Sequence, residues 1–162
     1  MTTSLELFAA RHKAERGAFV RVLKAVPAGR GEYRPEPRSR SALEIAWLLA
    51  SEERGLVSLF AKGEVEWTET PPPASVDEIA ALFESSGAEV DRLVATIDPK
   101  RWEATRARFL MGGQAVWEDT LEQMAWGFLF DGIHHRGQLS TYLRPMGGKV
   151  PAIYGPSADA NE

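Results

Sequence analysis

The sequence predicts an all-α fold, a four-helix bundle with a long connection between its third and fourth helices. Four segments repeat apolar residues with a period near 3.6, which is typical of amphipathic helices. Each segment opens with Ser or Thr followed three residues later by Glu or Gln, the sequence pattern of a capping box. No segment has a convincing strand pattern. Helices of about 20 residues joined in this way form a bundle, whose inward side chains can build metal and ligand sites.

The first two predicted helices have clear ends. The first begins at Thr3 and runs to about Val26, because Pro27 cannot continue a helix. The second begins at Ser41 and ends near Gly63.

The third and fourth predicted helices are bounded in the same way. The third begins at Ser75 and ends near Asp98, where Pro99 follows. The fourth begins at Thr120 and runs to Arg144, after which proline and glycine stop it.

The rest of the chain connects or extends these helices. Residues 100–119 contain Gly112-Gly113 between two short apolar runs, a pattern that indicates a small hairpin. The tail, about residues 145–162, begins too apolar for free solvent, so we expect it to pack back on the bundle. Residues 1–162 are therefore expected to form a single domain, long enough to bury a real core.

Composition excludes several classes of function. The chain has no cysteine, which removes disulfides, thiolate zinc sites and cysteine nucleophiles. A net charge of −4 without a basic block argues against nucleic-acid binding. No apolar run is long enough to span a bilayer, and the N-terminal residues do not resemble a signal peptide. We therefore expect a cytoplasmic protein that binds neither nucleic acid nor membrane.

The most informative segment is Phe128–Leu139 (FLFDGIHHRGQL), because it places polar side chains in the most apolar helix. Asp131 and His135 are four residues apart and project from one helix face. A carboxylate and an imidazole on a core-facing stripe are costly unless they are hydrogen-bonded, paired or bound to metal. A structural Asp–His hydrogen bond and a metal site are both consistent with this spacing.

Two runs in the sequence carry a resemblance to a known family. Ile133–Arg144, followed by Pro145–Pro151, resembles the C-terminal signature of the DinB-like four-helix-bundle superfamily, and Ser39–Trp47 resembles that family's entry into its second helix. The resemblance implies a divalent metal, often nickel or zinc, held by one histidine from the second helix and two, spaced i and i+4, from the fourth. It also implies homodimers, and in some members thiol-dependent transferase or hydrolase activity.

This chain departs from the three-histidine pattern. Asp131 occupies the position four before His135, and the second helix has no histidine near Trp47. Carboxylates can take these places: Glu53, on the apolar stripe of the second helix, is our predicted ligand with Asp131 and His135, and Glu52 is the alternative. This donor set suits Zn²⁺, Ni²⁺, Mn²⁺ or Fe²⁺ without choosing among them.

Three other residues, besides Glu52, have weaker claims on the site. His12 lies on the apolar stripe of the first helix, as a core histidine, a fourth ligand or a proton shuttle. His134 points away from His135 and is expected to be packed or hydrogen-bonded rather than to bind metal. Arg136 is a candidate for hydrogen-bonding to the ligands and fixing their orientation, or for an ion pair with Glu53.

Two functions from different classes follow. The first is a divalent-metal-dependent enzyme, of the thiol-dependent transferase or hydrolase type, in which a low-molecular-weight thiol or another small molecule approaches the metal. With no cysteine in the chain, such a thiol must be a cosubstrate. The second is a non-catalytic dimer or small-ligand binder with a decayed metal site. Five tryptophans and seven phenylalanines exceed what one thin bundle hides, which favours a homodimer.

Overall fold

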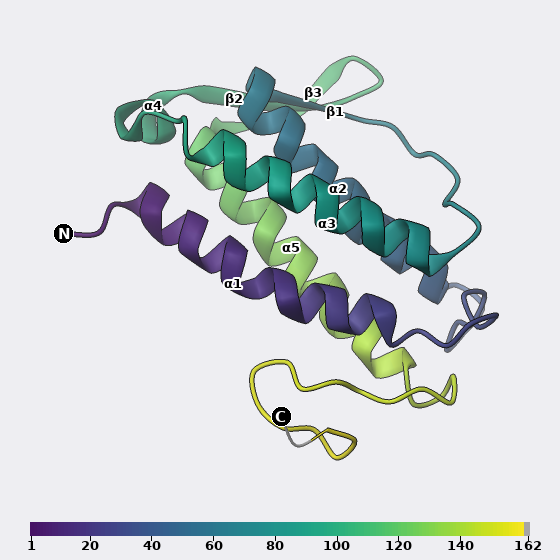
Figure 1. Ribbon diagram of the computed structural model, residues 1–162. Helices are drawn as coiled ribbons and strands as arrows, with labels where there is room; N and C mark the ends of the chain where they lie inside the picture. The colour runs from purple at the N-terminus through teal and green to yellow at the C-terminus, as the bar shows by residue number, and fades with distance from the viewer. Residues whose placement is uncertain (161–162) are drawn as a thin grey trace.

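The computed structural model describes residues 1–160, which form five helices and three strands (Figure 1). In chain order these are α1 (Ser4–Lys24), α2 (Ala42–Lys62), β1 (Glu64–Trp67), α3 (Val76–Val94), α4 (Pro99–Ala104), β2 (Arg106–Met111), β3 (Gln114–Thr120) and α5 (Leu121–Tyr142).

The four long helices begin where the sequence predicts them to begin. Thr3, Ser41, Ser75 and Thr120 are the N-caps of α1, α2, α3 and α5, and each side chain accepts a hydrogen bond from the backbone N–H three residues later. In α1 and α2 the glutamate of the capping box also accepts from the N-cap backbone, so both boxes are complete. Local sequence therefore fixes the starts of all four helices.

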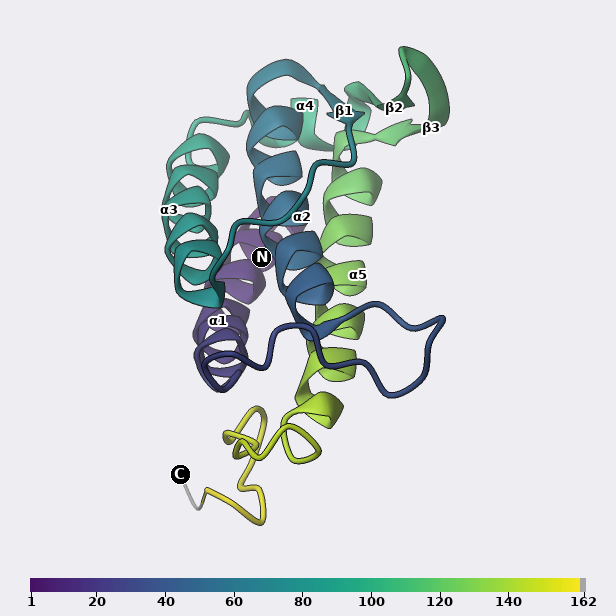
Figure 2. The same ribbon diagram turned by 90° about the vertical axis from the view of Figure 1, so that its right-hand side faces the viewer.

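The four long helices lie side by side and enclose the core (Figures 1 and 2). α2 packs against α3 on one side and α5 on the other, and α1 packs across α3 and α5. The apolar stripes of these helices meet in one cluster, in which Phe8, Ile45, Leu49, Met124 and Leu139 are almost completely buried. This packing brings the midpoints of α2 and α5 together.

A three-stranded sheet lies at the end of the helices where α2 stops and α5 starts (Figure 2). The predicted hairpin is confirmed: β2 and β3 pair antiparallel around Gly112 and Gly113, both of which have positive φ. β1 adds to β2 in parallel, in the order β1-β2-β3. The expectation of an all-α fold is thus wrong for this sheet, and the mostly helical prediction is confirmed for the rest.

The segment after α5 returns to the helices. The Arg21 side chain donates to the Ala152 carbonyl oxygen at 3.1 Å, and Tyr154 Oη donates to Glu15 at 2.8 Å. The last two residues of the predicted tail, 161–162, lie outside the described part. No helix within residues 1–160 has the length and apolar character needed to cross a membrane.

Candidate metal centre

The packing of α2 against α5 brings three potential ligands together. Glu52 comes from α2, and Asp131 and His135 lie one turn apart on α5. His135 Nε2 lies 3.6 Å from Asp131 Oδ1 and 3.9 Å from Glu52 Oε1, and one ligand atom from each residue lies within 4.8 Å of the other two. Small side-chain rotations would bring such atoms to the roughly 2.0–2.2 Å that imidazole and carboxylate ligands keep from a metal.

The orientation of His135 suits metal binding. Its Nδ1 lies 2.8 Å from Gln138 Oε1, one turn further along α5. An amide oxygen can only accept a hydrogen bond, so the ring proton lies on Nδ1. In the neutral imidazole Nε2 then carries the lone pair, and it faces the two carboxylates. Gln138 thereby orients the imidazole from three positions further along the same helix.

Glu52 carries an electrostatic cost. Its side chain is buried, and Oε2 has no hydrogen-bond partner among the described residues. Burial, together with the neighbouring Asp131 carboxyl group, raises the pKa of Glu52 from 4.5 to about 10. A cation between Glu52 and Asp131 would remove this cost, because it would attract both carboxylates and give the free oxygen a partner.

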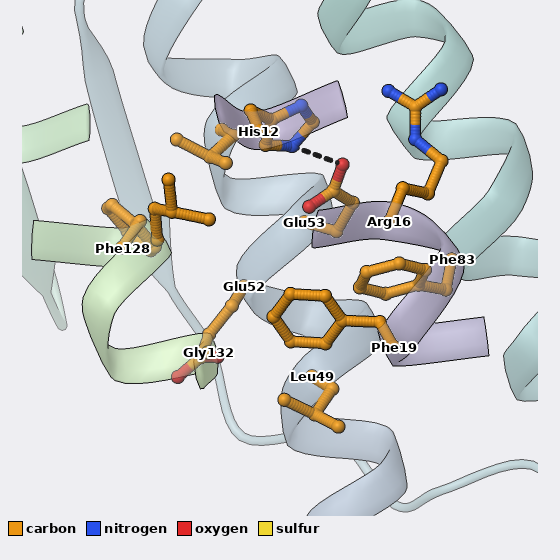
Figure 3. Close-up of a pocket in the computed structure, with 11 residues that line it drawn as sticks. His12, Arg16, Phe19, Leu49, Glu52, Glu53, Phe83, Phe128 and Gly132 are labelled. Atoms are coloured by element: carbon orange, nitrogen blue, oxygen red, sulfur yellow. Dashed lines mark ion pairs between the residues drawn. The ribbon is translucent and has the colours of Figure 1, made fainter. Parts of the chain in front are cut away.

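Glu53 faces a different group of side chains. Its Oε1 lies 2.8 Å from His12 Nε2, and both residues are buried (Figure 3). His12 Nδ1 in turn lies 3.9 Å from Asp91, which Arg16 binds through two hydrogen bonds. Glu53 Oε1 also lacks an aligned hydrogen bond, so its contact with His12 is close but not ideally directed. The structure therefore brings Glu52, rather than our first choice Glu53, to Asp131 and His135.

Figure 3 shows how consecutive glutamates reach different partners. Glu53 points toward His12 on α1, whereas Glu52 points toward Gly132 on α5. A Cβ atom on Gly132 would lie 3.4 Å from Glu52 Oε2 and 3.3 Å from the Phe19 ring, so the glycine leaves the carboxylate its room. Both glutamates line a small cavity of about 10 Å³, space for about one water.

The remaining candidates lie outside the cluster of three ligands. Arg136 is buried and pairs with Glu15 on α1 at 2.7 Å, and its second amino group donates to Tyr154 Oη. It therefore joins the C-terminal tail to α1 and α5 rather than pairing with Glu53. His134 is exposed, with its ring edge-on to the His135 ring at 5.1 Å. His12 belongs with Glu53, as described above.

The donor set fits a divalent metal. Two carboxylates and a neutral imidazole suit Zn²⁺, Ni²⁺, Mn²⁺ and Fe²⁺, and three protein ligands leave positions for a small molecule. Two observations support this fit: Glu52 Oε2 has no hydrogen-bond partner within residues 1–160, and Gln138 contacts His135 Nδ1 and so leaves Nε2 facing the carboxylates.

The fold and the three ligands define a mostly helical protein with a candidate divalent-metal site between two of its helices. The sequence matches the DinB family over residues 1–162, and the chain belongs to that family. Among solved structures it is similar to a DinB-like protein from Bacillus cereus, with a TM-score of 0.77, 18% identity, and coverage of 95% of this chain and 100% of the other. It is also similar to a DinB-like protein from Bacillus subtilis, with a TM-score of 0.65, 16% identity, and coverage of 87% and 92%. No curated protein matches the sequence.

Proposed function

We propose that this protein is a divalent-metal-dependent enzyme, of the thiol-dependent transferase or hydrolase type, built on a four-helix bundle formed by α1, α2, α3 and α5. Glu52, Asp131 and His135 would hold the metal. The observation that carries the proposal is the buried, unpartnered carboxylate oxygen of Glu52 beside a second carboxylate and an imidazole.

The metal and the residues around it would have different roles. When bound, the metal would supply Lewis acidity, lowering the pKa of a bound water or small-molecule thiol near neutral pH. Gln138 holds the His135 proton on Nδ1 and keeps Nε2 free. The buried side chain of Glu52 closes the site toward the core, whereas the Asp131 side chain is 60% exposed. The site is therefore open to solvent and to a small molecule on the Asp131 side.

A non-catalytic role is the second candidate. Asp131 occupies a position where the three-histidine pattern has a histidine, and α2 supplies a carboxylate instead of an imidazole. Carboxylates bind zinc and nickel less selectively than imidazole does. A dimeric small-ligand binder with a decayed metal site would retain the same fold and the same polar cluster.

Thermal melting with and without zinc tests the proposal. A metal that binds only the folded protein stabilises it by about 2.7 kcal/mol at a hundredfold excess over Kd. We expect zinc or nickel to raise the melting temperature of the parent and of His134→Ala, and to leave that of His135→Ala unchanged. His134→Ala is the matched control, because it removes the neighbouring imidazole but no ligand. Equal shifts in the parent and His135→Ala would place the ion elsewhere, and no shift with any divalent metal would favour the non-catalytic role.

The homodimer remains a proposal with a narrower basis. Most tryptophans and phenylalanines are buried or partly buried, and within residues 1–160 only Trp117 and Phe130 of these two types are exposed. Sedimentation of the untagged protein at micromolar concentration measures the oligomeric state, and a monomer near 17.9 kDa would contradict the proposal.

A further inference from the structure

An open, mostly aromatic cleft of about 630 Å³ lies between the sheet and α5. Phe109 of β2 and Trp117 of β3 form its sheet side, and Phe128 and Phe130 form its helix side. Phe130 is 61% exposed and Trp117 37% exposed, so neither ring is hidden in the core. Four aromatic rings from three elements, β2, β3 and α5, thus converge on a space the size of a small-molecule site.

Close packing of the sheet against α5 forms the wall of the cleft. A Cβ atom on Gly127 of α5 would lie 2.6 Å from the Trp117 ring, too close for any other residue without displacing that ring. Glycine at this position therefore lets the indole lie directly against the helix backbone. The Phe109 and Phe128 rings lie 5.9 Å apart and join the two sides of the cleft.

The cleft adjoins the candidate metal centre. Asp131 lines the cleft and also belongs to the cluster of three ligands, so this residue is common to both. His134, one turn away from Phe130, is the second polar side chain of the lining. The aromatic rings therefore lie beside a polar end formed by Asp131 and His134.

We propose that this cleft binds the apolar part of the substrate, an aromatic or bulky aliphatic group carried by a small molecule whose metal-binding polar group lies at Asp131. The inference rests on the proposed function and adds the substrate class to it. A concave, mostly apolar space with a few polar groups at one end is the usual form of a small-molecule site. Its continuity with the ligand cluster favours a substrate over a second copy of the chain, which needs no contact with Asp131.

Calorimetry with three hydroxamic acids tests the substrate class. Acetohydroxamate supplies only the metal-binding group, and benzohydroxamate and 3-phenylpropionohydroxamate add a phenyl ring at two distances from it. Zinc binding by the parent, Trp117→Ala, Phe130→Ala and Leu7→Ala is measured first, followed by each hydroxamate on the zinc-loaded protein. Leu7 is the matched control, an apolar side chain that is 52% exposed on α1 and does not line the cleft.

We expect all four proteins to bind zinc equally. At least one phenyl compound should bind the parent and Leu7→Ala about tenfold more tightly than acetohydroxamate, a difference of about 1.4 kcal/mol. Trp117→Ala and Phe130→Ala should lose most of this preference while binding acetohydroxamate as the parent does. Phe130→Ala keeps the test decisive, since the exposed Phe130 ring can be removed without emptying the core.

Three results would overturn the inference in distinguishable ways. A parent that binds neither zinc nor nickel, manganese or iron(II) refutes the proposed function, and the inference with it. Zinc binding without any phenyl preference, or with a preference that both variants retain, refutes the aromatic cleft alone. Conversion of a dimer to a monomer by Phe130→Ala, with unchanged hydroxamate affinities, would identify the same surface as an interface between two copies.

Discussion

Glu52 and Glu53 are consecutive on α2 and similarly buried, but their carboxylates have opposite surroundings. Glu53 lies beside the His12 imidazole, in a group that also contains the guanidinium of Arg16. Glu52 lies beside a second carboxylate, Asp131, and its nearest imidazole nitrogen, His135 Nε2, is 3.9 Å away. Adjacent residues of a helix point about 100° apart, so one helix can serve both groups. The comparison shows that burial alone does not distinguish the two carboxylates, and that Glu52 is the one that lies with Asp131 and His135.

The largest expected effect is a pH-dependent decrease in the free energy of unfolding, caused by Glu52. Its pKa is about 10 in the folded protein and 4.5 as the ordinary value, so the folded state holds a proton that the unfolded state releases. Stability is then lost as pH rises above 4.5, by at most about 1.4 kcal/mol per pH unit. We expect Glu52→Gln, measured in EDTA by urea unfolding, to match the parent near pH 5 and exceed its free energy of unfolding at pH 8.

Added zinc should reverse this order at pH 8. Zinc stabilises the parent, whereas Glu52→Gln lacks one of the three ligands and should gain less stability from zinc. A difference between the two proteins that does not change with pH in EDTA would mean that Glu52 is not the strained carboxylate.

On the Glu53 side the expected effect comes from breaking a pair. His12→Leu leaves the Glu53 carboxylate buried without its neighbour, and we expect a loss of about 3 kcal/mol in the free energy of unfolding. The double variant His12→Leu with Glu53→Leu should recover most of that loss, because two apolar side chains can replace a buried pair. Urea unfolding of the four proteins completes a double-mutant cycle, and simple additivity would show that the two side chains are not coupled.

Replacing Asp131 changes the charge balance around Glu52 directly. Asp131→His removes a carboxylate next to Glu52, and it supplies two imidazoles spaced i and i+4 on α5. We expect zinc affinity to stay the same or increase up to about tenfold, which competition with a coloured chelator measures. Asp131→Ala is the control and should bind zinc more weakly. If Asp131→Ala binds zinc as tightly as the parent, position 131 does not face the metal.

Two glycines of α5 give the smallest expected effects. A Cβ at Gly137 meets nothing within 4 Å, so Gly137→Ala should stabilise the protein by about 0.5–1 kcal/mol through its helix propensity. Gly132→Ala adds the same propensity but crowds Phe19 and Glu52, so its gain should be smaller or absent. Thermal melting compares the two, and an equal gain in both would mean that the Glu52 carboxylate has more room than the structure indicates.

The parts of the structure that depend on local sequence could be predicted. Helix starts follow from cap residues and their partners three positions later, and the hairpin follows from Gly112 and Gly113. β1 could not be predicted, because its four residues become a strand only by pairing with β2 some 40 residues later in the chain (Glu64 with Arg108). The short helix α4 has a capping aspartate and a proline at its start, but its six residues are too few for a periodic pattern.

The candidate site could be predicted on one helix and not on the other. Asp131 and His135 are four residues apart and therefore share one face of a helix, so the sequence of α5 alone was enough to identify them as candidate ligands. The choice between Glu52 and Glu53 depends on how α2 is rotated against α1 and α5, which helical periodicity does not determine when both residues are buried. Glu15 was missed as the partner of Arg136, although its position on the buried face of α1 is a readable signal.

The measurement that tests the central claim most directly is an anomalous difference map at the zinc edge, from crystals of the untagged protein grown with zinc. We predict a peak between Glu52, Asp131 and His135, with Glu53 still against His12. A peak beside His12, Glu53 and Asp91, or no peak near either glutamate, would contradict the assignment of the metal to Glu52.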